Sequence, residues 1–98
     1  MDTKRFAYIS RSAWAGQMVG DALGASVEGW RQERIRGYYP DGLEVMLPDS
    51  PIFGYRPAGS VTDDTQMALC LHRALEESRG WNPQMTMKCY REWYATNP

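Results

Sequence analysis

The chain has 98 residues and a mass of 11.2 kDa, which is enough for one domain with a modest hydrophobic core. Its hydrophobic fraction of 43% and charged fraction of 23% are typical of a globular protein and argue against disorder. Eleven basic residues against twelve acidic ones give a net charge of −1, which argues against a strongly basic nucleic-acid-binding surface. We therefore predict a single domain over residues 1–98 and no nucleic-acid partner.

The lengths of the apolar runs and the number of cysteines indicate the cellular compartment. The longest strictly apolar run, Met67–Leu71, is far shorter than the roughly 20 residues that a membrane span needs. No apolar stretch that could serve as a signal peptide follows the N-terminus. Cys70 and Cys89 are too few for a disulfide framework and His72 is the only histidine, so we expect reduced thiols and no zinc site. These features predict a cytoplasmic protein without a membrane partner.

The first predicted element is a helix over Ser12–Gly29, where apolar residues recur at helical spacing. Gly16, Gly20 and Gly24 lie inside this segment at intervals of four residues, so they share one helical face. Each glycine inside a helix costs about 1 kcal/mol relative to alanine. A bare face of this kind indicates either tight packing against another helix or close approach of a ligand, and the residues alone leave both open.

Residues 30–61 are predicted to form a long connection, because four of the six prolines and four of the nine glycines lie there. Within it we expect a turn at residues 40–42, a short helical turn at Gln32–Arg36 and a short extended piece at Leu43–Leu47. Structureless loops of this length are uncommon in compact domains and often act as lids or binding loops.

Two further helices are predicted in the C-terminal part. One should start at Thr62, a good N-cap, and stop at Gly80. The other should open with Asn82 as its cap and Pro83 as its first residue, and should end at Asn97-Pro98. No convincing pair of strands is present. The predicted fold class is therefore all-α, with three helices and a long loop.

The segment Thr62-Asp63-Asp64-Thr65 is the first candidate for chemistry. Acidic residues in the first turn of a helix are favoured by the helix dipole and by free backbone N–H groups, which explains a single aspartate without any function. Two adjacent aspartates repel each other, however, and their oxygens together with a threonine hydroxyl suit a hard cation. Helix capping and metal binding both remain open from the residues alone.

Asp21 and Glu28 are the second candidate. Their separation of seven residues is nearly two helical turns, so on the predicted helix both carboxylates point in the same direction. Taken alone, an acidic pair on a small and apolar helix face is explained by solvation.

Two segments together resemble the opening of the ADP-ribosylglycohydrolase family, which includes the dinitrogenase reductase-activating glycohydrolases. They are residues 16–28, GQMVGDALGASVE, and residues 59–69, GSVTDDTQMAL. The resemblance covers essentially the whole chain, including the later segment Tyr90–Tyr94. It implies an all-α bundle with a binuclear magnesium or manganese centre that hydrolyses the glycosidic bond between ADP-ribose and arginine, serine or another acceptor.

The resemblance also implies roles for individual residues. Thr62, Asp63 and Asp64 correspond to ligands of Mg²⁺ or Mn²⁺, and Glu28 corresponds to the catalytic acidic residue beside the metals, facing the ribose. Asp21 is expected to be structural and to hold a helix end or a loop. The implied partner is an ADP-ribosylated protein or ADP-ribose itself.

The chain departs from the family on its C-terminal side. Family members are several times longer and complete the metal site with a later Asp-x-Asp-Thr motif, whereas Asp64 is the last aspartate of this sequence. One interpretation is an N-terminal part of the enzyme that carries half of the site and is inactive by itself. The alternative is a non-catalytic protein-binding or inhibitor module, such as one encoded by a phage or mobile element. Whether the natural reading frame ends at Pro98 stays open.

An apolar helix face left uncovered by the absent part of the bundle predicts association. We expect either a homo-oligomer or a protein partner that covers this face.

Overall fold

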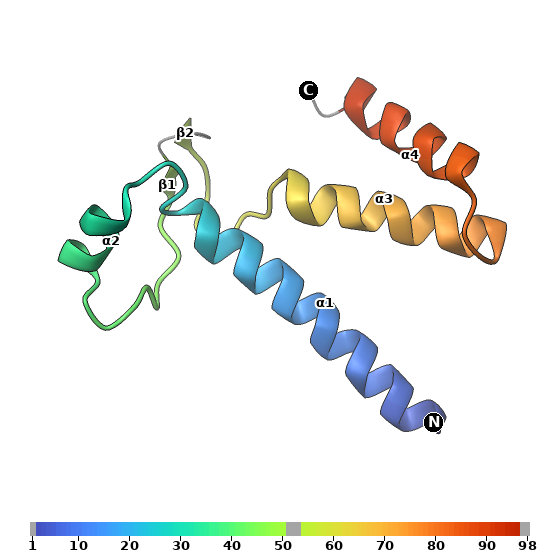
Figure 1. The fold of residues 1–98 in the computed structure, drawn as a ribbon, viewed down its shortest axis with the longest axis horizontal. Coiled ribbons are helices and arrows are strands. Elements are labelled where there is room, and N and C mark those ends of the chain that lie inside the picture. Colours follow the sequence, from blue (N-terminus) through green and yellow to red (C-terminus); the bar gives the residue numbers. More distant parts are fainter. Residues whose placement is uncertain (1, 51–53, 97–98) are drawn as a thin grey trace. The chain divides into compact units, whose positions relative to one another are not determined.

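The computed structural model describes residues 2–50 and 54–96, and the chain divides into two compact units. Unit 1 is Met1–Thr62 and unit 2 is Asp63–Pro98. Figure 1 shows that helices make up nearly all of the regular structure. The described residues form four helices, so the all-α class is confirmed in outline and the predicted count of three helices is wrong.

Helix α1, Thr3–Ala25, belongs to unit 1 and begins well before the predicted start at Ser12. Asp2 is the N-cap, and its side chain accepts a hydrogen bond of 2.8 Å from the backbone N–H of Arg5. No proline or glycine interrupts residues 3–11, so the capped helix continues into the glycine-containing segment. The predicted end at Gly29 is also wrong, because residues 26–29 form a turn in which Gly29 has φ +86°.

The three glycines of α1 do not pack closely against a neighbour among the described residues. A Cβ atom placed on Gly16, Gly20 or Gly24 would meet nothing within 4 Å. All three positions are exposed. The tight helix packing that their spacing suggested is therefore absent from the part of the chain that the structure describes.

Helix α2, Gln32–Tyr38, confirms the short helical turn expected after residue 30. It packs on Trp30, whose ring stacks on Tyr39 at 6.3 Å between centroids and meets Tyr38 edge-on at 5.8 Å. The guanidinium of Arg34 lies 4.0 Å from the centre of the Trp30 ring. The expected turn follows directly, since the N–H of Gly42 donates to the carbonyl of Tyr39 at 3.0 Å.

Two very short strands correct the expectation that no strands pair. β1, Asp49–Ser50, and β2, Gly54–Tyr55, form an antiparallel ladder in which Asp49 opposes Tyr55 and Ser50 opposes Gly54. The extended piece expected at Leu43–Leu47 is not a strand. This segment is instead tied to the end of α1, because the Leu47 N–H donates to the buried Ser26 Oγ at 2.9 Å.

Unit 2 is a pair of packed helices, α3 over Asp63–Ser78 and α4 over Pro83–Thr96. The start of α4 confirms the prediction, because Asn82 Oδ1 accepts a hydrogen bond from the Met85 N–H at 3.0 Å. Asn97 and Pro98, where this helix was expected to end, lie outside the described residues. The buried residues of the pair are small: Thr65, Ala74, Thr86 and Cys89.

The end of α3 differs in detail from the prediction, which placed the stop at Gly80. The left-handed residue is Arg79, with φ +53°, and Gly80 follows with φ +149°. The Gly80 N–H donates to the carbonyl of Leu75 at 3.1 Å, which closes the last turn. An arginine therefore occupies a backbone conformation that normally favours glycine.

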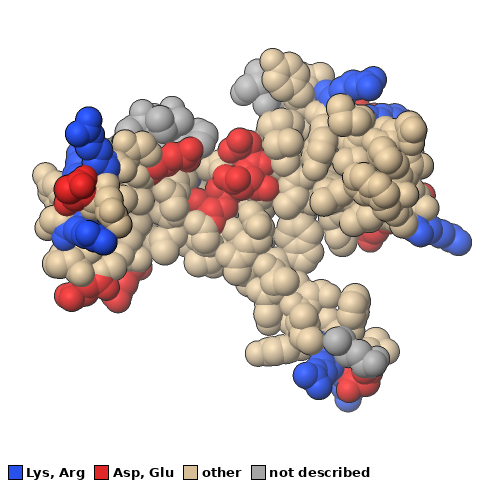
Figure 2. Space-filling view, in the orientation of Figure 1, with Lys and Arg blue, Asp and Glu red and all other residues tan. Residues whose placement is uncertain are grey.

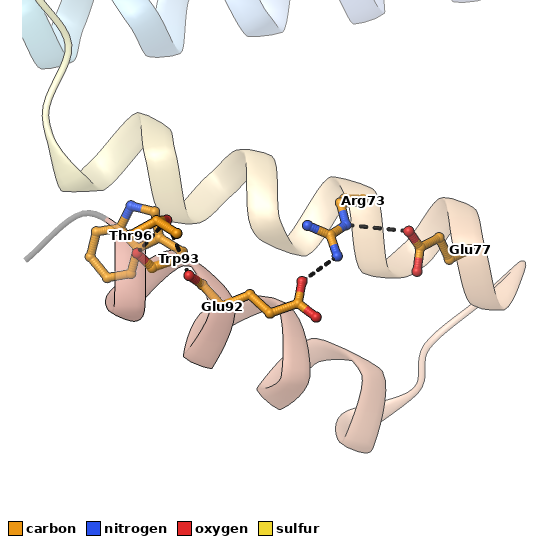
Figure 3. Close-up of polar contacts among 5 residues, drawn as sticks. All are labelled: Arg73, Glu77, Glu92, Trp93 and Thr96. Carbon is orange, nitrogen blue, oxygen red and sulfur yellow. Dashed lines mark hydrogen bonds and ion pairs between the residues drawn. The ribbon is translucent and has the colours of Figure 1, made fainter.

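Polar contacts hold the two helices of unit 2 in register (Figure 3). Arg73 of α3 pairs with Glu92 of α4 at 2.5 Å and with Glu77 of its own helix at 3.2 Å. The hydrogen bond between Arg73 and Glu92 raises the pKa of the guanidinium and lowers the pKa of the Glu92 carboxyl. Trp93 Nε1 donates to Gln66 Oε1 at 2.8 Å.

None of the helices in the described ranges combines the length and apolar character that crossing a bilayer requires.

Candidate functional site

Thr62, the residue immediately before α3, is fixed to α1 by Asp21. The Asp21 carboxylate accepts two hydrogen bonds, from the Thr62 N–H at 2.8 Å and from the Thr62 hydroxyl at 2.5 Å. Thr62 is buried, with 5% of its surface exposed, and Asp21 is half-buried. Both residues belong to unit 1, so the contact ties the end of this unit to its main helix. The expectation that Asp21 holds a loop or helix end is confirmed.

The double hydrogen bond also determines how the threonine hydroxyl is presented. A hydroxyl has one hydrogen and two acceptor lone pairs. Because the hydrogen is donated to Asp21, Thr62 Oγ1 interacts with any other group through its lone pairs only. Asp21 is thus a positioning residue for Thr62, a connection that sequence spacing did not reveal because the two positions are 41 residues apart.

Asp63 and Asp64 occupy the first turn of α3, as predicted, and both are exposed. Thr65, the last residue of the motif, is buried with 1% exposure. In this motif two exposed carboxylates are therefore flanked by two buried threonines. This arrangement suits either a capped helix start or a set of oxygen ligands.

Glu28 lies in the turn that follows α1 and is exposed. Its N–H donates to the carbonyl of Ala25 at 3.4 Å. Because α1 ends at Ala25, Glu28 is not on the helix, and the argument that it shares a helical face with Asp21 does not hold. Glu28 belongs to unit 1, whereas Asp63 and Asp64 belong to unit 2.

Within the described ranges, no three side chains of His, Cys, Asp or Glu gather closely enough to hold a metal ion. The roles assigned to Glu28, Thr62, Asp63 and Asp64 remain predictions.

Charged side chains around α2 carry both signs. Arg31, Arg34 and Arg36 are exposed and Glu33 lies among them. On the face drawn in Figure 2, Lys and Arg form small separate groups beside Asp and Glu rather than one continuous basic surface. One of the arginines, Arg34, already packs on the Trp30 ring.

Comparison with known proteins gives a consistent family. The profile of the ADP-ribosylglycohydrolase family matches residues 4–98. A protein of Acanthamoeba polyphaga mimivirus, provisionally named as an ADP-ribosyl glycohydrolase, is 35% identical over 95 residues, which cover 91% of this chain and 27% of the viral protein. The ADP-ribosyl-[dinitrogen reductase] glycohydrolase of Rhodospirillum rubrum is 40% identical over 63 residues, or 64% of this chain and 20% of that enzyme.

A third relative, the uncharacterised YegU protein of Escherichia coli, is 37% identical over 68 residues. No solved structure gives a significant match. The chain spans 27% of the length of the viral relative and 20% of the length of the Rhodospirillum enzyme. The family profile nevertheless covers nearly all of this sequence, and the chain belongs to the ADP-ribosylglycohydrolase family.

Proposed function

We propose that this chain supplies the N-terminal part of the active site of a metal-dependent ADP-ribosylglycohydrolase. The observation that carries the proposal is the Thr62-Asp63-Asp64 segment at the start of α3, with Thr62 anchored to α1 by Asp21. Family membership supplies the class of reaction, namely hydrolysis of the glycosidic bond that joins ADP-ribose to a protein side chain. The substrate would then be an ADP-ribosylated protein.

The residues present fit Mg²⁺ or Mn²⁺. Both ions prefer oxygen ligands, and the segment offers two exposed carboxylates and a hydroxyl whose hydrogen is already donated elsewhere. Ligands of metal ions are commonly oriented by hydrogen bonds from a surrounding group, and Asp21 makes such bonds to Thr62. Thr62, Asp63 and Asp64 would hold the ion.

Hydrolysis of a glycosidic bond passes through a state with oxocarbenium character. A bound divalent ion would orient the ribose hydroxyls and polarise a water molecule or the leaving group. Glu28 would contribute a carboxylate that accepts or returns a proton at the reacting ribose, in the way that general acid–base residues act. Its exposed position in a turn leaves its oxygens open to a substrate.

The surface of α1 favours a protein partner. Phe6, Met18 and Val19 are 62%, 42% and 52% exposed. Since successive residues of a helix are rotated by about 100°, Met18 and Val19 project about 120° and 220° round the axis from Phe6. A helix that is apolar on several sides is normally buried inside a larger bundle. We infer that further protein surrounds α1, either the remainder of the family fold or another chain.

Manganese binding tests the proposed ligands. The isolated chain should bind Mn²⁺ saturably but weakly, with a dissociation constant of about 1 mM, because few carboxylates are available to neutralise the ion. Electron paramagnetic resonance of free Mn²⁺ during a titration measures this directly. Asp64→Asn should abolish saturation, and Asp21→Asn should weaken binding by disturbing Thr62.

Asp41→Asn is the matched control, because Asp41 is an exposed aspartate in the turn of unit 1 and should leave binding unchanged. Circular dichroism of each variant separates loss of binding from loss of folding. A chain whose titration shows no saturable binding, or whose Asp64→Asn variant binds as well as the unaltered protein, would contradict the assignment of ligands and favour simple helix capping.

A further inference from the structure

A groove of about 350 Å³ lies between α3 and α4, entirely within unit 2. Its lining includes both cysteines of the protein; the full set is Cys70, Arg73, Cys89, Glu92, Trp93 and Thr96. Both cysteines are free thiols. Cys70 is partly exposed, whereas Cys89 is completely buried. Four of the lining residues, Arg73, Glu92, Trp93 and Thr96, are drawn in Figure 3.

The register of the two helices places the thiols opposite each other. Gln66 of α3 and Trp93 of α4 are joined by a hydrogen bond of 2.8 Å. One helical turn is close to four residues. A step of one turn forward along α3 from Gln66 reaches Cys70, and a step of one turn back along α4 from Trp93 reaches Cys89. In an antiparallel pair these steps run in the same direction, so the cysteines face each other across the interface.

An ion pair and small buried residues lie at the same interface. Arg73 and Glu92, which pair at 2.5 Å, lie beside the two cysteines on the same groove. Further along the pair, the buried residues Ala74 and Thr86 are small and allow the helices to approach closely. A disulfide requires Cα atoms within about 7 Å, and close approach of the two backbones favours this distance.

We propose that Cys70 and Cys89 form an oxidation site in which a peroxide converts the two thiols into a disulfide that links α3 to α4. The site is separate from the proposed metal ligands and does not depend on the proposed function. Because Cys70 is the accessible member of the pair, it reacts with the peroxide first. The buried Cys89 then attacks the oxidised Cys70 to form the disulfide.

The reaction balances with one equivalent of hydrogen peroxide. The Cys70 sulfur, after loss of its proton, attacks one peroxide oxygen, the O–O bond breaks, and the released hydroxide takes up a proton to form water. This step oxidises Cys70 to a sulfenic acid. The Cys89 sulfur then attacks the Cys70 sulfur, the S–O bond breaks, and a second water leaves with the proton of the Cys89 thiol. Overall, two thiols and one peroxide give one disulfide and two waters.

The surroundings of Cys70 make the first step slow at neutral pH. Burial raises the pKa of the Cys70 thiol, and the neighbouring Cys89 and Glu92 raise it further, while Arg73 acts in the opposite direction. The thiolate is the reactive form. The rate of crosslinking should therefore increase as the pH rises through the alkaline range.

The test is oxidation of the full chain by hydrogen peroxide, followed by acid quenching and intact mass measurement. We expect a monomer that has lost two hydrogen atoms and both titratable thiols, and peptide mapping without reductant should join the segments that contain Cys70 and Cys89. In urea the thiols should oxidise faster, because unfolding removes the burial that raises the pKa of Cys70. A smaller share of the oxidised chains should then carry the internal disulfide, because unfolding also removes the juxtaposition of the two thiols.

A register control keeps two thiols but separates them. The double variant Cys70→Ser with His72→Cys moves one thiol to an exposed position on the other side of α3. It should give linked dimers or over-oxidised thiols and no crosslink within one chain. The proposal is overturned if the unaltered chain behaves like this control, if Cys70 passes to sulfinic acid while Cys89 stays a thiol, or if the share of internal disulfide is as large in urea as in the folded protein.

Discussion

The Asp21 carboxylate shows how a single residue can join distant parts of the sequence. It accepts two hydrogen bonds from Thr62, and the two positions are 41 residues apart. Both bonds end on a carboxylate in a partly buried site, where such bonds are stronger than neutral ones. Thr62, which precedes the two aspartates of α3, is therefore held in place by a residue of α1 that lies 41 positions earlier in the sequence.

Replacing Asp21 tests this anchor through stability. Asp21→Asn should lower the free energy of unfolding by about 1.5–3 kcal/mol, because the amide can satisfy only one of the two Thr62 donors with the same geometry. Urea denaturation followed by circular dichroism measures the change. Glu28→Gln, which alters an exposed carboxylate in a turn of the same unit, should change stability little. Equal stability of the Asp21→Asn variant and the unaltered chain would contradict a structural role for the two bonds.

Arg79 presents a second effect of a single residue, because its φ of +53° places it in the left-handed region. This conformation costs an L-residue about 1–2 kcal/mol, and glycine avoids the cost but loses more entropy on folding. Arg79→Gly should therefore stabilise unit 2 by about 0.5–1 kcal/mol. Arg79→Ala keeps the Cβ atom and should bring no such gain. Thermal denaturation of the three proteins under identical conditions distinguishes a backbone effect from loss of the arginine charge.

At the scale of the elements, α1 combines a long helix with an unoccupied face. Gly16, Gly20 and Gly24 have open space where a Cβ atom would lie. The glycines weaken the helix and, among the described residues, gain no close contact in return. Among the described residues, no close contact of these glycines offsets the helix stability that they lose.

Gly20→Ala should consequently increase the free energy of unfolding by about 1 kcal/mol, since the methyl group meets no neighbour within 4 Å. Urea denaturation provides the measurement. Gly42→Ala is a useful contrast, because Gly42 also has open space but adopts φ +99°, where an L-residue is strained. That variant should be destabilised. A loss of stability in Gly20→Ala would indicate that something packs on the bare face.

The stability of the helix pair α3 and α4 should depend on pH. The hydrogen bond from Arg73 lowers the pKa of Glu92 in the folded protein, so the folded state binds this proton less readily than the unfolded chain does. The pairing of Arg73 with Glu92 then stabilises the fold at pH values above the pKa of Glu92 in the unfolded chain, about 4.3. This stabilisation is lost as the pH falls through the lower pKa that Glu92 has in the folded protein. Both side chains are about half exposed, so the effect should be small and sensitive to salt.

Thermal denaturation of Glu92→Gln at a series of pH values tests this. The variant should lose stability relative to the unaltered protein near neutral pH, and the difference should shrink as the pH falls below about 4. Glu76→Gln changes an exposed glutamate that contacts His72 instead and is the matched control. A difference between Glu92→Gln and the unaltered chain that stays constant across the acid range would contradict titration of Glu92 as the cause.

At the scale of the whole molecule, the chain divides into two compact units, and the predicted site residues are distributed over both. Glu28 and Thr62 belong to unit 1, whereas Asp63 and Asp64 begin unit 2. Thr62 and Asp63 are consecutive, so the boundary between the units passes through the motif itself. Catalysis by a site of this kind requires that further residues of the family fold hold these groups in one arrangement.

The isolated chain should therefore release no ADP-ribose from proteins modified on arginine or serine, even with Mg²⁺ or Mn²⁺ present. Its sequence contains no Asp-x-Asp, so at most three predicted carboxylates serve the two-ion centre that the family resemblance implies. Chromatographic detection of ADP-ribose over many turnovers is the measurement. Sustained release that Asp64→Ala abolishes would show that the chain is a complete enzyme.

The sequence by itself determined most of the helical framework of this protein. Asn82 and Pro83 predicted the start of α4, and Thr62 predicted where α3 begins, because capping chemistry acts over only a few residues. The family could likewise be recognised from two short motifs, since their residue types and spacing are local properties of the chain. The early start of α1 at Thr3, capped by Asp2, was also a local signal, but the apolar periodicity after Ser12 obscured it.

Only the tertiary structure decided which distant residues meet. The contacts of Asp21 with Thr62 and of Ser26 with Leu47 depend on the path of a long connection, which local propensities do not determine. The short ladder of β1 and β2 arises in the same way, because backbone pairing across a loop needs both ends to be brought together. The alignment of Cys70 with Cys89 required the register of two helices, which the hydrogen bond between Gln66 and Trp93 indicates.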